Sequence, residues 1–101
     1  MQKLDEQQLH EAVAKLPQWH LVDGEIVRTW TFPDFVAALV FVNRVAQEAE
    51  KAGHHPDIDI RYNRVKLALV THDAGGISAT DIKMATILNN LEESESHSPE
   101  N

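Results

Sequence analysis

The sequence has no cysteine, only four prolines and four glycines, and few basic residues. Without cysteine there is no disulfide and no thiolate site for zinc, iron–sulfur or redox chemistry. Nine basic residues against sixteen acidic ones leave a formal charge of −7, which argues against a nucleic-acid surface. The longest apolar run, Phe35–Val42, is far shorter than the roughly 20 residues of a membrane span. Residues 1–6 lack the apolar core of a signal peptide, so we expect a cytoplasmic protein that binds neither nucleic acid nor membrane.

The composition divides the chain into a folded part and a tail. A length of 101 residues and a hydrophobic fraction of 43% suit one globular domain. Residues 92–101 hold four of the sixteen acidic residues, no basic residue and no large apolar side chain. Burial in this segment could not offset the entropy lost on ordering. The sequence therefore predicts a single domain over 1–91 and an acidic, disordered tail over 92–101.

Three segments have the spacing and the end signals of helices: 5–15, 34–52 and 78–91. Asp34 is placed to cap the start of the second helix, and Gly53 is placed to end it in a left-handed conformation. Apolar residues at helical spacing predict the buried stripe of this helix, which consists of Phe35, Leu39, Val42, Ala46 and Ala49.

Four segments rich in β-branched, aromatic or alternating residues are predicted to be strands: 19–22, 25–32, 57–62 and 65–71. Asp23-Gly24 and Asn63-Arg64 separate them into two hairpins. The segment 65–71 is apolar at nearly every position, which indicates a central strand. The order α-β-β-α-β-β-α predicts an α+β fold, with a four-stranded antiparallel sheet and the helices packed on one face.

Two valines of the long helix do not belong to the predicted stripe. Val36 and Val40 lie four residues apart, on the side that also carries Arg44, Gln47 and Lys51. Isolated apolar residues are common on protein surfaces. The valines, together with the open edges of the sheet, instead favour an oligomer.

Three of the six histidines stand at the ends of predicted elements. His54 and His55 follow the long helix, and His72 is expected to end the central strand. The remaining three, His10, His20 and His97, are expected to be solvated surface residues. Functional groups are often placed in loops that rigid elements support, so the first three are the candidates.

Three kinds of chemistry suit these candidates. Imidazoles titrate near neutral pH, so a pair of them can act as general acid and general base. Equally, they could be structural residues that satisfy backbone carbonyls at element ends. A metal site of His54, His72 and one carboxylate, Asp73 or Asp81, is less well supported by the spacing.

Further residues are positioned to complete a site. Glu50 lies one helical turn before His54, and Asp81 is the third residue after Ser78 in an acidic capping box. Asp81 is expected to accept the backbone N–H of the cap, and either carboxylate could orient an imidazole. Trp19 is expected in the core, although a flat aromatic ring can also form the wall of a site for a planar ligand.

Three sequence motifs, taken together, resemble the signature of the pterin-4a-carbinolamine dehydratases. The first, Glu50-Lys51-Ala52-Gly53-His54-His55-Pro56, has the family pattern E-x-x-x-H-H-P. The second is Tyr62-Asn63-Arg64-Val65, and the third is Thr71-His72 with the glycine loop that leads to Ser78 and Asp81. The resemblance extends from Trp19 to Leu91 and implies the same α-β-β-α-β-β-α order.

The resemblance implies an enzyme that dehydrates 4a-hydroxytetrahydrobiopterin to quinonoid dihydropterin and water. This reaction belongs to the recycling of tetrahydrobiopterin after its use by an aromatic amino acid hydroxylase, which is the expected pathway partner. Neither a cofactor nor a metal is required. The family also implies a homodimer or homotetramer, and it includes divergent, non-catalytic members. A dimerisation or assembly module on the same fold is therefore the alternative function.

The family's site residues can be assigned to this chain where the motif matches. His54 and His72 correspond to the acid–base histidines, and His55 to a catalytic-site histidine that chiefly binds substrate. The resemblance implies that the substrate is held and oriented by Glu50, Pro56, Thr71, Asp73, Ala74, Asp81 and Trp19. Gly53 is a departure, because some relatives have Asp there.

Overall fold

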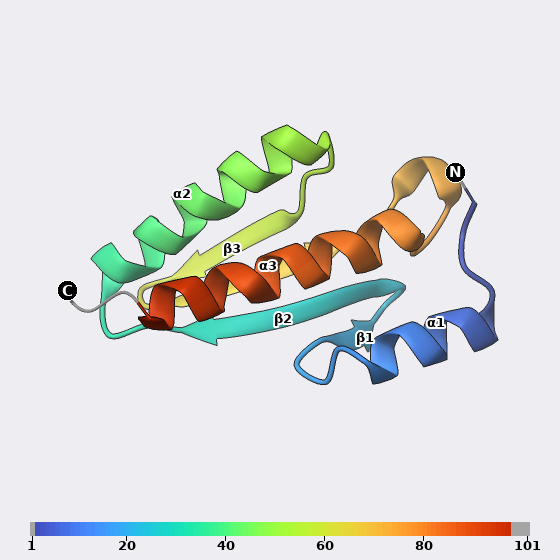
Figure 1. Cartoon of the computed structure of the whole chain (residues 1–101), viewed down its shortest axis with the longest axis horizontal. Helices are drawn as coiled ribbons and strands as arrows, with labels where there is room; N and C mark the ends of the chain where they lie inside the picture. Colours follow the sequence, from blue (N-terminus) through green and yellow to red (C-terminus); the bar gives the residue numbers. More distant parts are fainter. Residues whose placement is uncertain (1, 98–101) are drawn as a thin grey trace.

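The computed structural model describes the backbone of residues 2–97 and the side chains of residues 2–91. Figure 1 shows the elements, which in chain order are α1 (Glu6–Ala14), β1 (His20–Val22), β2 (Glu25–Thr31), α2 (Phe35–Ala52), β3 (Asp57–Arg61), β4 (Arg64–Leu69), the 3₁₀ helix η1 (His72–Ala74) and α3 (Ala79–His97). Among the described residues, no helix is both long enough and apolar enough to cross a membrane.

The four strands form one antiparallel sheet in the order β1-β2-β4-β3. Each hairpin turns through residues with positive φ, Asp23 and Gly24 in the first and Tyr62 in the second. The predicted central position of β4 is confirmed, because it pairs with both β2 and β3. Helices α2 and α3 lie over one face of the sheet, and α1 lies beside β1 (Figure 1). The α+β fold predicted from the sequence is thus confirmed.

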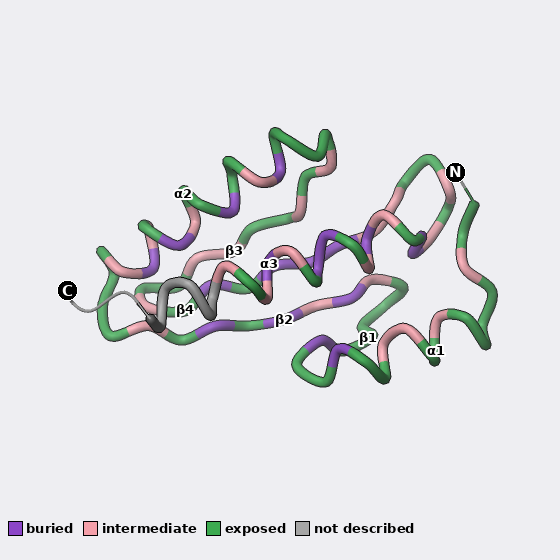
Figure 2. The backbone as a smooth tube through the Cα atoms, in the orientation of Figure 1, coloured by how far each residue is buried: buried purple, intermediate pink, exposed green. Residues whose placement is uncertain are grey.

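The core lies between the sheet and helices α2 and α3. Alternate residues of β2 and β4 point into it, and Phe41 of α2 packs against Trp30 and Phe32 with ring centroids 4.8 and 5.1 Å away. Buried residues recur along α2, α3 and β2 in Figure 2, whereas α1 has none. Its Leu9 and Val13 are only partly buried against the core.

The predicted buried stripe of α2 is wrong in phase. The helix buries Ala38, Phe41, Val45 and Ala49, of which the prediction contained only Ala49. Phe35 is 44% exposed, and Ala46 is exposed as well. The reason is that the first two turns of α2 are apolar on every side, so periodicity could not identify the face that meets the sheet.

Several predicted boundaries also differ from the structure. The second hairpin turns through Tyr62 and Asn63, so Arg64, which was predicted to be a turn residue, begins β4. Strand β4 ends at Leu69, so His72 does not end it but begins η1. Helix α3 extends to His97 rather than ending near Leu91, because Glu and Ser are tolerated in a helix that has already formed. The sequence also predicts a disordered tail over 92–101. These residues lie outside the part of the chain whose side chains are described, so the disorder stays a prediction.

Candidate active site

The end of α2 places His54. Gly53 adopts φ 64° and ψ 30°, and its N–H and that of His54 bond the last carbonyls of the helix. A left-handed residue is strained for any side chain that branches at Cβ, so glycine suits this position. The chain leaves α2 abruptly, and His54 turns toward the start of α3.

His54 is held there by a buried carboxylate. Its Nε2 lies 2.6 Å from Oδ1 of Asp81. The Asp81 side chain is 0% exposed and that of His54 is 15% exposed. The other carboxylate oxygen of Asp81, Oδ2, accepts hydrogen bonds from the Thr71 hydroxyl at 2.7 Å and the Ser78 backbone N–H at 2.9 Å. The predicted bond from the cap N–H to Asp81 is confirmed.

This arrangement determines which nitrogen of His54 remains available. An ionised carboxylate can only accept hydrogen bonds, so His54 donates to Asp81 from Nε2. In the neutral imidazole the lone pair is then on Nδ1, which can take up a proton. Asp81 fixes both the tautomer and the ring orientation, and it stabilises the imidazolium that forms when His54 is protonated.

His55 makes a similar pair on the surface. Its Nε2 lies 2.6 Å from Oε2 of Glu50. Here the side chains are 61% and 77% exposed, so solvent screens their attraction. Two neighbouring histidines therefore pair with two different carboxylates in opposite environments. The buried pair is suited to precise positioning, whereas the exposed pair has room to rearrange around a ligand.

His72 is carried by a tight loop whose base is pinned. Thr71 and Gly76 exchange backbone hydrogen bonds at 3.0 and 3.3 Å, and Gly75 takes the left-handed conformation with φ 77°. The Thr71 hydroxyl also contacts the Ser78 hydroxyl at 2.7 Å. The His72 side chain is exposed and has no hydrogen-bond partner among the residues whose side chains are described. It is thus free to meet a ligand.

The three histidines line one open pocket of about 290 Å³. It is formed where the connection after α2 faces the loop after β4, and its lining residues are Gly53, His54, His55, Val70, Thr71, His72 and Asp73. A volume near 300 Å³ accommodates a small planar ligand. Two of the lining imidazoles, those of His54 and His72, come from separate loops.

The structure places the other predicted site residues in different surroundings. Asp73 lines the pocket. Pro56 and Ala74 are half-buried, and each directly follows a lining residue in the sequence. Glu50 bonds to His55 without lining the pocket. Trp19 is 2% exposed in the core, where its Nε1 donates to Asn89 at 2.9 Å, and its expected place at the wall of the site stays a prediction.

Three contributors were not among the predicted site residues. Gly53 and Val70 line the pocket, and Ser78 bonds both Asp81 and Thr71. Ser78 could have been found, because its capping-box partner is Asp81. Val70 carries no such signal. Among the described residues, no three His, Cys, Asp or Glu side chains are grouped so that they could hold a metal ion.

Comparison with known proteins gives a consistent picture. The sequence profile of the family described as pterin 4 alpha carbinolamine dehydratase matches residues 2–91. A protein of Acidobacterium capsulatum is 55% identical over 90% of this chain and 99% of its own length. One of Chloroflexus aurantiacus is 52% identical over 90% of this chain and 98% of its own. Both carry the provisional name pterin-4-alpha-carbinolamine dehydratase.

Two solved structures share the architecture. The crystal structure of a transcriptional coactivator/pterin dehydratase from Brucella melitensis superposes with a TM-score of 0.84 at 40% identity, covering 88% of this chain and 97% of that one. A pterin dehydratase-like RuBisCO assembly factor of the alpha-carboxysome superposes with a TM-score of 0.61 at 16% identity, covering 72% and 84%. The second likeness concerns the fold alone.

Proposed function

The chain belongs to the pterin-4-alpha-carbinolamine dehydratase family, and we propose that it is an active dehydratase of 4a-hydroxytetrahydrobiopterin. The reaction removes the 4a-hydroxyl as water and a proton from N5, which leaves a C4a=N5 double bond in quinonoid dihydropterin. It needs one proton donor and one proton acceptor in the same pocket. The family match supports pterin chemistry, and the pocket supplies the two groups.

In this proposal, His54 and His72 exchange the two protons. One imidazolium donates to the departing hydroxyl while the other, neutral imidazole accepts the N5 proton, and general acid–base assistance of this kind contributes typically 10²–10⁴-fold. The two 4a-epimers present the hydroxyl to opposite faces of the ring, so each epimer could use the pair in the opposite sense.

The remaining residues bind and orient the pterin. His55 with Glu50 offers polar groups at the exposed side of the pocket. Asp73, Ala74 and Pro56 complete the proposed substrate contacts. Asp81 acts through His54, because its side chain has no exposed surface with which to touch a ligand. Thr71 holds the Asp81 carboxylate with its hydroxyl and also lines the pocket.

One observation supports the catalytic role most directly: the 2.6 Å bond of His54 to the buried Asp81 in a pocket that His72 shares. The experiment is the rate of dehydration of chemically generated 4a-hydroxytetrahydropterin at neutral pH. We expect clear acceleration over buffer, and a large loss of rate in both His54→Ala and His72→Ala. His10→Ala, on the exposed side of α1, is the control and should be fully active. Full activity in both site variants would contradict the assigned mechanism.

The proposal also covers the oligomeric state, the cellular location and the pathway partner. Exposed Val36 and Val40 on α2 support a homodimer or homotetramer. A cytoplasmic location and an aromatic amino acid hydroxylase in the same pathway are further parts of the proposal. The alternative, a non-catalytic dimerisation or assembly module, predicts no acceleration at enzyme levels comparable to substrate.

A further inference from the structure

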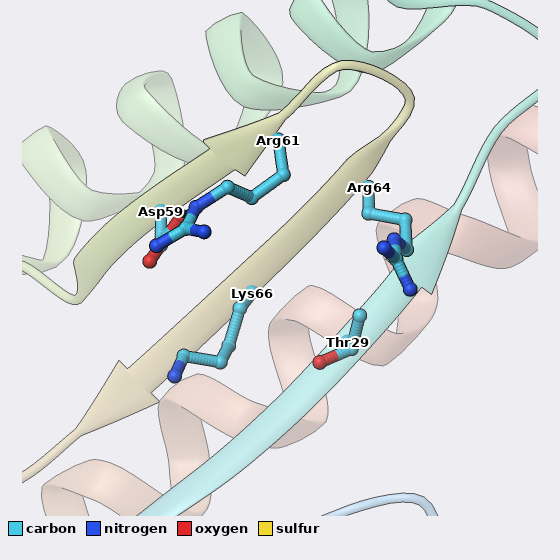
Figure 3. A pocket seen from close by; sticks show the side chains of 5 residues that line it. All are labelled: Thr29, Asp59, Arg61, Arg64 and Lys66. Carbon is cyan, nitrogen blue, oxygen red and sulfur yellow. Dashed lines mark hydrogen bonds and ion pairs between the residues drawn. The ribbon is translucent and has the colours of Figure 1, made fainter.

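A cluster of positive charge lies on the sheet face opposite the helices. Figure 3 shows five side chains from three strands around one hollow of about 280 Å³: Thr29 of β2, Asp59 and Arg61 of β3, and Arg64 and Lys66 of β4. None of them lines the histidine pocket. The proposed dehydration makes no use of this cluster.

Strand register creates the cluster. Lys66 lies directly opposite both Thr29 and Asp59, and Arg61 lies directly opposite Arg64. Paired residues share a sheet face, and so do residues two apart on one strand. Val65 and Leu67, which flank Lys66 on β4, point to the other face of the sheet and are buried beneath the helices. The cluster therefore faces solvent.

The charges of the cluster are not balanced. It holds three cations and one carboxylate, and that carboxylate is engaged, because Asp59 Oδ1 accepts from Arg61 Nε at 3.0 Å. Arg64 and Lys66 have no hydrogen-bond or ion-pair partner among the residues whose side chains are described. The cluster therefore carries a charge of about +2 in a chain of net charge −7. Like charges placed opposite each other, such as Arg61 and Arg64, are destabilising until an anion comes between them.

We propose that this cluster binds the phosphate group of a small phosphate monoester. Such a group carries about −1.5 to −2 charges at neutral pH, which matches the excess on the cluster. The guanidinium groups of Arg61 and Arg64 can bind phosphate oxygens in bidentate fashion, Lys66 supplies a point charge, and Thr29 a hydroxyl donor. The hollow is larger than a phosphate group and leaves space for a small attached moiety.

Two polymeric partners fit this face less well. A nucleic-acid surface usually makes 6–10 phosphate contacts, and three cations cannot supply them. An extended acidic peptide would meet Glu25 and Asp57, because the strand alternation places both on the same face as the cluster. A single phosphate avoids both objections.

The test is titration of the isotopically labelled chain with phenyl phosphate, followed by backbone amide shifts in NMR. We expect saturable shifts at residues 29, 59–61 and 64–66. The double variant Arg64→Gln/Lys66→Gln should weaken binding by about tenfold or more, because it removes two charge-assisted hydrogen bonds. Lys15→Gln/Lys83→Gln, which removes two exposed positive charges, one at the end of α1 and one on α3, is the matched control and should bind within about twofold of the parent chain.

Other results would overturn the proposal. Shifts no larger than those caused by sodium chloride at equal ionic strength would show that the cluster holds no specific phosphate site. Shifts confined to residues 53–55 and 70–73 would place the phosphate in the histidine pocket instead. Binding of a single-stranded oligonucleotide without binding of phenyl phosphate would assign the surface to nucleic acid. The dehydration assay does not enter this test, so the two proposals fail independently.

Discussion

At the scale of single residues, the buried carboxylate of Asp81 decides what His54 can do. It accepts hydrogen bonds from the His54 ring, the Thr71 hydroxyl and the Ser78 backbone N–H. The bonds from Thr71 and Ser78 hold the carboxylate rigidly, so the imidazole cannot rotate without breaking a 2.6 Å contact. Rigid support of this kind positions a proton-transfer group within the small tolerance that catalysis requires.

Asp81→Asn therefore tests the positioning role. The amide has the same shape, but an NH₂ group facing His54 would donate to Nε2 and transfer the ring proton to Nδ1. We expect kcat to fall about 10²–10⁴-fold with little change in KM, because the available nitrogen loses its lone pair. The ¹⁵N shifts of His54 should report the change of tautomer.

Glu50→Gln provides the control for Asp81→Asn. Its pair with His55 is exposed, so the same chemical change should lower kcat less than about tenfold. Thermal melting of both variants shows whether the fold is retained. If Asp81→Asn kept the parental tautomer and rate, the positioning role would be refuted.

At the scale of elements, the orientation of α2 on the sheet buries one of its two phenylalanines and leaves the other exposed. Phe41 is fully buried and contacts two aromatic rings, whereas Phe35 is 44% exposed. The first turns of α2 are apolar all round, so one side is left uncovered by the rest of this chain.

Phe41→Ala should destabilise the chain by about 3–5 kcal/mol, the usual cost of removing a buried aromatic ring and leaving a cavity. Phe35→Ala should cost less than about 1 kcal/mol in the monomer, because little apolar surface is lost from the core. Urea unfolding monitored by Trp fluorescence measures both values. Equal costs would mean that the burial phase of α2 differs from the one described.

The uncovered side of α2 leads to a prediction about the oligomeric state. Val36 and Val40 are 68% and 45% exposed, and charged residues at these positions should break an interface while keeping the helix. We expect sedimentation velocity to show an oligomer of the 11.4 kDa chain, and a monomer for Val36→Glu/Val40→Glu. Gln7→Glu/Ala14→Glu, which adds the same two charges at exposed positions of α1, is the control and should leave the mass unchanged. A monomeric parent chain would contradict the proposed assembly.

At the scale of the whole molecule, the relatives define the extent of the fold. The family profile ends at residue 91, and 91 aligned residues cover 99% of the Acidobacterium protein. The residues that form the core and the histidine pocket all lie within that range.

A chain shortened to residues 1–91 should therefore fold and keep its dehydration rate within about twofold. Deletion removes four acidic residues and leaves the described core intact, so the melting temperature should change by only a few degrees. Circular dichroism and the rate assay measure the two quantities. Unfolding on truncation would show that residues 92–101 stabilise the fold.

The sequence by itself determined the local features of this protein. Asp34 caps α2, Gly53 ends it, Asp23-Gly24 turns the first hairpin, and Ser78 pairs with Asp81. Each depends on hydrogen bonds or dihedral angles within a few residues, so the residue type is sufficient to predict it. The motif with His54, His55 and His72 likewise indicated the family, because it consists of short stretches of consecutive residues that can be recognised without the structure.

Only the tertiary structure decided which distant groups meet. It set the strand order β1-β2-β4-β3, the buried face of α2, and the pairing of His54 with Asp81 and of His55 with Glu50. It also brought three cations of β3 and β4 to one face of the sheet. The physical reason is that these contacts depend on register and packing between segments far apart in the chain, which no local preference specifies.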